Sequence, residues 1–214
     1  LGWRAFPGYP RIPFTRVNMR ALLPVLALGM FATTAGAGEI RSEYTDIDAG
    51  RTCSVFDIAT EGGEFANLVC AGYRGYPVLL YSGDLRESVF FGFQPDTGHV
   101  WESFGPFNGV GAKVEWRIES DGDREIPFAT ILRWSVSNPE DADRTVEVLV
   151  VEKVGLVDER QGCAVGLVMA TGNPKANETA RRIADEQARE FVCGADERVV
   201  VQGKVPMPDF SAQD

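Results

Sequence analysis

Histidine is almost absent from this chain, and cysteine occurs only four times, never in the C-x-x-C spacing of a metal or redox site. The single histidine, His99, has no G-x-S-x-G or comparable nucleophile context around it, which argues against a Ser-His-acid or Cys-His centre. Structural zinc sites draw on clustered cysteine and histidine ligands, and no such cluster is visible. We therefore assign no catalytic residue, no metal ligand and no cofactor from the sequence.

Positive charge is also scarce. The 214 residues hold 21 Lys plus Arg against 31 Asp plus Glu, a formal net charge of −10. Binding to a phosphate backbone depends on clustered positive charge, so this balance argues against a nucleic-acid partner and against an anionic membrane surface. No apolar stretch reaches the roughly 20 residues that a membrane-spanning helix needs, so we expect no transmembrane segment in the mature chain.

The N-terminal region predicts export. Residues 1–18 contain no acid, and we interpret them as an extension that is unstructured or not native. Met19 begins a short positive segment, an apolar stretch follows, and Ala35 and Ala37 occupy the two positions that a signal peptidase reads. We predict a signal peptide over residues 19–37, cleaved near Ala37, and a periplasmic or secreted mature protein. An interior hydrophobic helix is the alternative.

All four cysteines, Cys53, Cys70, Cys163 and Cys193, follow the predicted signal peptide. An even number of cysteines in an oxidising compartment favours two disulfides, for which three pairings are possible. We favour Cys53–Cys70 with Cys163–Cys193, because each bond would join neighbouring elements. Zinc binding by the cysteines is the alternative.

Short strands dominate the predicted secondary structure. Between residues 40 and 93, strand-like runs recur about every ten residues, a pattern typical of an antiparallel sheet, sandwich or barrel. Val114, Trp116 and Ile118 alternate with charged residues, as in a half-buried strand. We predict a mainly β (α+β) fold, built as an antiparallel sheet, a sandwich or a partly open barrel.

One substantial helix is predicted near the C-terminus, over about residues 174–192. Asn173 suits the start of a helix and Gly194 its end. A stripe made mostly of alanine runs along one face, which indicates close packing on the sheet. We place one domain over residues 38–205 and a flexible tail over residues 206–214.

Four side chains are candidate binding residues. Phe107 lies in the Gly- and Pro-rich loop of residues 104–111, which could expose it, and Trp101 precedes this loop. Exposed loop aromatics are typical of protein contact sites. Arg117 and Arg133 are predicted on the sheet face opposite the tryptophans, where a guanidinium could bind a carboxylate or phosphate. Pairing of each arginine with a neighbouring acid is the alternative.

Several segments support a resemblance to other proteins. They are Glu115-Trp116-Arg117, Phe128-Ala129-Thr130-Ile131, Arg133-Trp134 and the stretch from Cys163 through Asn177-Glu178-Thr179-Ala180-Arg181-Arg182-Ile183-Ala184-Asp185-Glu186 to Phe191-Val192-Cys193. On these segments, most of the mature chain resembles a group of uncharacterised exported proteins of alphaproteobacteria. The resemblance implies export and a bacterial source, and it carries no known activity. The chain departs from it at Ala164, where a histidine is expected beside Cys163.

These observations predict an exported envelope protein that is not an enzyme and binds another macromolecule, a protein or an envelope glycan, as an inhibitor or accessory factor. Two alternatives stay open. Acids such as Glu87, Glu102 and Glu115 could converge as the carboxylate pair of a cofactor-independent hydrolase acting on envelope glycan. The protein could also be a structural component of the envelope.

Overall fold

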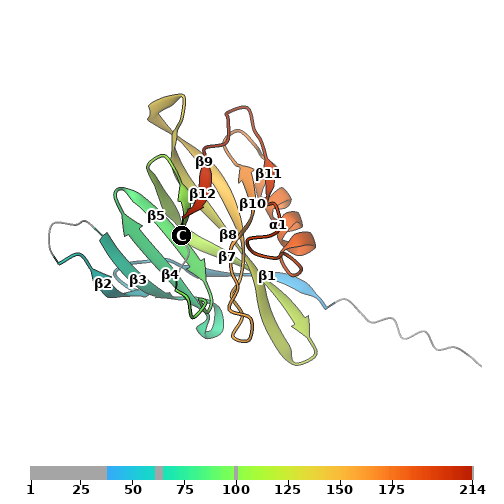
Figure 1. The fold of residues 1–214 in the computed structure, drawn as a ribbon. Helices are drawn as coiled ribbons and strands as arrows, with labels where there is room; N and C mark the ends of the chain where they lie inside the picture. Colours follow the sequence, from blue (N-terminus) through green and yellow to red (C-terminus); the bar gives the residue numbers. More distant parts are fainter. Residues whose placement is uncertain (1–37, 61–64, 99–100, 214) are drawn as a thin grey trace, which may run out of the picture. The chain divides into compact units, whose positions relative to one another are not determined.

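The structure is a computed structural model that describes residues 38–60, 65–98 and 101–213. The described strands form a six-stranded sheet, here the large sheet, a four-stranded sheet, here the small sheet, and a two-stranded ribbon (Figure 1). The large sheet has the order β1 (Ile40–Asp46), β7 (Asn108–Asp121), β8 (Arg124–Asn138), β9 (Asp141–Lys153), β10 (Ala164–Met169) and β11 (Val199–Val201). The small sheet has the order β2 (Cys53–Ile58), β3 (Phe65–Ala71), β4 (Pro77–Gly83) and β5 (Arg86–Phe91). The ribbon pairs β6 (Trp101–Phe104) with β12 (Phe210–Gln213), a 3-10 turn spans Tyr73–Gly75, and helix α1 spans Ala176–Gln187.

Neighbouring strands are antiparallel except β10 and β11, which are parallel. The strand order in each sheet is open, so neither sheet closes into a barrel. The predicted mainly β fold with one C-terminal helix is therefore confirmed, in the form of two open sheets.

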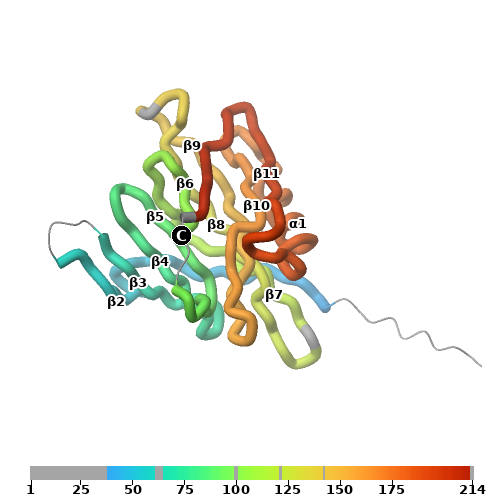
Figure 2. Tube along the Cα trace, in the orientation of Figure 1, coloured from blue at the N-terminus to red at the C-terminus, as the bar shows by residue number. Residues whose placement is uncertain are grey.

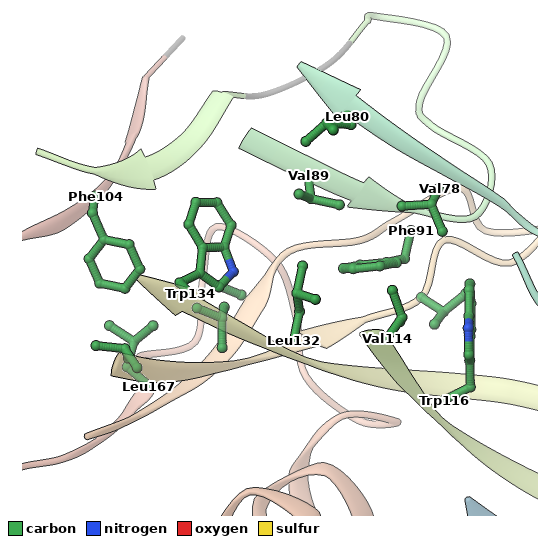
Figure 3. Close-up of a cluster of buried hydrophobic side chains, with 14 of the residues drawn as sticks. Val78, Leu80, Val89, Phe91, Phe104, Val114, Trp116, Leu132, Trp134 and Leu167 are labelled. Carbon is green, nitrogen blue, oxygen red and sulfur yellow. The ribbon is translucent and has the colours of Figure 1, made fainter. Parts of the chain in front are cut away.

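The main core lies between the two sheets. Strands β7 and β8 alternate as predicted and place Trp116 and Trp134 in this space, with 0% and 1% of their surface exposed. Figure 3 shows both rings beside Phe91 and Phe104, which meet them edge-on at centroid distances of 5.7 and 5.6 Å. Burial of such large aromatic side chains supplies much of the free energy that joins two sheets.

Helix α1 covers the opposite face of the large sheet (Figure 1). The predicted alanine stripe faces the strands, and its buried members are Ala176, Ala180, Ile183 and Ala184. The helix is shorter than predicted, because beyond Gln187 the chain continues in turns that carry Cys193 to its disulfide. Asn173 still organises the start of this segment, since its side-chain oxygen accepts a 3.0 Å hydrogen bond from the Lys175 N–H.

Both predicted disulfides are present. Cys53–Cys70 joins directly paired positions of β2 and β3. Cys163–Cys193 joins the residue before β10 to the segment after α1, with Cα atoms 5.9 Å apart. Every cysteine is bonded in this way, which leaves no thiolate for the zinc alternative.

Part of the predicted C-terminal tail forms a strand. Phe210–Gln213 form β12 and pair with β6, and Figure 2 shows this end of the chain beside β6. The Phe210 ring packs against Phe104 at a centroid distance of 4.8 Å. A single aromatic residue in a polar, proline-containing segment anchors it, because its burial outweighs the weak local preference for a strand.

A β-bulge interrupts the alternation of side chains along β8. Continued alternation from Trp134 would place Phe128 on the face of the tryptophans, but it packs on the helix side of the large sheet. Arg117 pairs with Ala129 and the next residue, Ile118, pairs with Pro127, so Phe128 has no partner of its own. One extra residue reverses the alternation of side chains, and the period of the sequence does not reveal it.

Candidate functional site

Arg117 lies on the face of β7 opposite the tryptophans, as predicted, and is only 8% exposed there under α1. Its guanidinium donates two hydrogen bonds of 2.8 Å to the Asp185 carboxylate on α1 and another to the Ser42 hydroxyl on β1. These partners occupy the guanidinium inside the fold. The geometry therefore favours the alternative reading, pairing with a neighbouring acid.

Arg117 is the middle member of a charge ladder that joins β7 to α1 and to the turn directly after it. The ladder consists of Glu115–Arg181, Arg117–Asp185 and Glu119–Arg189. Residues two apart on a strand are separated by about 6.6 Å and residues four apart on a helix by about 6.0 Å, so the two repeats nearly match. The hydrogen bond to Glu115 is the main reason why the pKa of the Arg181 guanidinium is raised. This ladder fixes the helix on the sheet and uses Glu115 for that purpose.

Arg133 lies on β8 and pairs with Glu147 of β9 at 3.0 Å. It borders a 230 Å³ hollow together with Lys113 and Arg181. All three cations already have a carboxylate partner, so the hollow presents little uncompensated positive charge. Here too the contacts favour a structural role.

Phe107, in contrast, is exposed. Half of its surface, 50%, is accessible, and its ring lies 5.1 Å from the guanidinium carbon of Arg86. The Asn108 N–H donates a 3.2 Å hydrogen bond to the carbonyl of Leu85, which ties this loop to the β4–β5 turn. Leu85 is 69% exposed, and Phe65, paired with the end of β4, is 41% exposed. We name Phe65, Leu85 and Phe107 the apolar rim.

Trp101 does not belong to the apolar rim. It is half-buried at the start of β6, paired with the last residue of β12. Trp101 thus lies on the ribbon, whereas Phe107 lies in the loop that the Asn108 N–H ties to the β4–β5 turn.

The β4–β5 turn that carries Leu85 has an unusual backbone. Asp84 and Leu85 have φ angles of 49° and 56°, the left-handed region at both central positions of a two-residue hairpin. Such turns favour Asn-Gly or Asp-Gly. A left-handed conformation costs an ordinary residue about 1–2 kcal/mol, and strained residues of this kind cluster at functional sites. The turn holds an exposed leucine where folding alone favours glycine.

A hollow of 340 Å³ lies beside the apolar rim, lined by Ser82, Gly83, Leu85, Arg86, Glu87 and Asn108. Glu87 is partly buried there, and its carboxylate accepts a 2.6 Å hydrogen bond from the Val110 N–H. Burial raises the pKa of the Glu87 carboxyl. The hollow thus places an acidic hydrogen-bond acceptor next to exposed apolar side chains.

A second candidate site is a cavity of 430 Å³ beside the Cys163–Cys193 disulfide. Glu102 lines it and accepts hydrogen bonds from the Ala164 N–H at 2.8 Å and from Arg198 at 3.4 Å. Glu152, 4% exposed, is not among the lining residues. Burial raises the pKa of the Glu102 carboxyl, and it raises that of Glu152 strongly, with a smaller contribution from the Glu102 charge.

Sequence reasoning missed Leu85, Glu152 and Arg198. A leucine directly after Ser-Gly-Asp in a turn was a usable signal, because glycine is favoured there. Glu152, an acid at the end of an apolar strand, was a second usable signal, because carboxylates are rarely buried. Arg198 sits in a polar stretch that gives no signal.

His99 and the predicted signal peptide lie outside the described residues. In the parts that the structure describes, no three or more His, Cys, Asp or Glu residues are grouped to hold a metal ion. No helix in those parts is long and apolar enough to cross a membrane. Comparison with protein-family models, curated proteins and solved structures finds no match to this chain.

Proposed function

We propose that this protein is an exported, non-enzymatic envelope module that binds a partner protein through its apolar rim, as an inhibitor or accessory factor. The observation that carries the proposal is the β4–β5 turn, which presents Leu85 at 69% exposure in a left-handed conformation. Stability does not account for that residue in that position. A contact made by the exposed side chain does.

The surroundings of the apolar rim indicate the chemistry of the partner. Interface centres combine apolar anchors with pockets for single side chains, and the 340 Å³ hollow is such a pocket. It holds the Glu87 carboxylate, whereas the exposed Asp84 carboxylate at the tip of the turn is paired with Arg86 at 2.5 Å. The whole chain has a net charge of −10. A partner that presents an apolar surface and one Lys or Arg side chain would match these features.

Affinity capture from the envelope of the source organism tests the proposal. Wild-type protein should retain a partner, and Phe107→Ala should weaken retention by at least about tenfold, because truncating an anchoring aromatic costs roughly 2 kcal/mol or more. Val157→Ala, at a residue 54% exposed outside the apolar rim, is the matched control. Equal retention by Phe107→Ala and wild type would remove the rim from consideration.

Hydrolysis of an envelope glycan is the second candidate. It is favoured by two carboxylates that line the same 430 Å³ cavity, those of Glu102 and Asp196. Burial raises the pKa of the Glu102 carboxyl, as a general acid requires. Release of reducing sugar from purified envelope glycan, abolished by Glu102→Gln, would support this candidate over the binding module.

A further inference from the structure

Strand β2 forms one outer edge of the small sheet, and no strand in the described part of the chain pairs with its outer side (Figure 1). The backbone bonds from Ala71 to Thr52 and from Ala59 to Phe65 show which positions face β3. In an antiparallel pair these positions alternate with ones that point outward.

The register on both sides of the bulge then places the outward-facing N–H and C=O groups at Cys53, Val55 and Ile58. These groups form the face that a further strand would bind. The bulge interrupts this face at Phe56, so the face can accept only a short strand.

The side chains on this edge are apolar and exposed. Val55, Phe56 and Ile58 each have 53% to 58% of their surface accessible. Asp57 is the only charged residue of β2. The Phe56 ring meets Tyr81 of β4, and Tyr81 pairs with Asn67, two residues from Phe65 on β3, so Phe56 lies on the same face of the small sheet as Phe65 of the apolar rim. An open edge with exposed apolar side chains invites pairing with another chain.

We infer that β2 accepts an extended segment of the partner protein as an added strand, and that this segment alternates apolar residues with Lys or Arg. The inference rests on the proposed function, since it describes how the same partner binds. Main-chain hydrogen bonds at Val55 and Ile58 provide affinity in this mode, and the side chains provide specificity. A cationic segment matches Asp57 and the net charge of −10. A second copy of this chain would instead bring two acidic molecules together.

The first experiment uses the purified protein and a capped synthetic peptide that alternates valine with lysine. Hydrogen exchange is followed at single amides. The outward amides of Val55 and Ile58 should exchange at least about tenfold more slowly with millimolar peptide, whereas the inward amide of Ser54 should not change. Absence of protection, or equal protection by a valine–glutamate peptide, overturns the inference.

The second experiment uses two variants of one residue. Val55→Pro removes an outward N–H that makes no bond to β3, and an edge position tolerates proline. Val55→Thr keeps the N–H and the shape of the side chain. Peptide binding should fall at least about tenfold for Val55→Pro and stay within about threefold for Val55→Thr, because added strands bind through the main chain. Equal binding by the two variants overturns the inference.

Two further results separate this inference from the proposed function. If Phe107→Ala abolishes partner capture while wild-type protein shows no peptide protection at β2, the apolar rim binds without strand addition. If wild-type protein captures no partner but the peptide protects Val55 and Ile58, strand addition holds and the rim proposal fails. A concentration-dependent dimer in sedimentation that protects the same amides without peptide would assign the edge to a second copy and overturn the inference.

Discussion

Replacement of Leu85 by glycine should weaken binding without weakening the fold. Glycine removes the left-handed strain of about 1–2 kcal/mol that leucine bears at a φ of 56°. Against this, glycine gains conformational freedom in the unfolded chain, about 0.5–1 kcal/mol. Loss of the buried third of the leucine side chain costs about 0.5–1 kcal/mol more. These terms nearly cancel, so the free energy of unfolding should stay within about 1 kcal/mol of wild type.

Binding should respond differently, because in the proposed function the exposed Leu85 side chain contacts the partner. Removal of an anchor costs a complex roughly 2 kcal/mol, and every 1.4 kcal/mol is tenfold in affinity, so capture should fall at least about tenfold. Urea unfolding and quantitative capture, run on wild type and Leu85→Gly, measure the two quantities. Leu85→Asn is the control for backbone strain, since asparagine tolerates the left-handed region without the flexibility of glycine. Retained capture by both variants would refute the role of Leu85, and loss of stability well beyond 1 kcal/mol would refute the strain argument.

Three further predictions concern Glu152, the Arg117–Asp185 ion pair and the Cys163–Cys193 disulfide. Burial raises the pKa of the Glu152 carboxyl well above 4.5, so the folded state binds its proton more tightly than the unfolded state does. The free energy of unfolding should therefore fall as pH rises from about 4.5 through the folded pKa. Urea unfolding at several pH values should show that Glu152→Gln is more stable than wild type at neutral pH and that its stability depends less on pH. Asp185→Leu should cost about 3 kcal/mol because it leaves the Arg117 charge buried, and adding Arg117→Met should restore most of that loss in a double-mutant cycle. Replacement of both Cys163 and Cys193 by serine should lower the free energy of unfolding by about 3–4 kcal/mol relative to wild type. Urea unfolding of the two proteins, both with the Cys53–Cys70 disulfide intact, measures this difference.

Period-2 alternation made much of this fold predictable. Trp116 and Trp134 lie on one face and Arg117 and Arg133 on the other because side chains on a strand alternate strictly. The alanine stripe likewise predicted which side of the helix meets the sheet. Both patterns are local repeats that can be recognised in the sequence, and the side chains lie on the expected faces wherever the strands are regular.

Non-local partners were not predictable in the same way. The bulge at Phe128 reverses the alternation through pairing with another strand, and Phe210 is ordered by contact with Phe104, more than a hundred residues away. The same holds for the candidate site. Phe107 was identified from its loop, but Leu85 joins it only because the Asn108 N–H binds the Leu85 carbonyl. Contacts of this kind depend on the topology of the fold, which cannot be predicted from a short segment of sequence.

The packing of the two sheets explains why the functional surface should lie on the small sheet. The large sheet is covered on both faces, by the small sheet with the ribbon on one side and by α1 on the other. Its most conspicuous charged residues, among them Arg117 and Glu115, are used in holding the helix. The small sheet is covered on its core face, and it keeps an open edge at β2 and an exposed turn at Leu85. Val55, Phe56, Ile58, Phe65 and Leu85 are exposed there. Substitutions at the apolar rim and at β2 should therefore alter binding with little effect on the core.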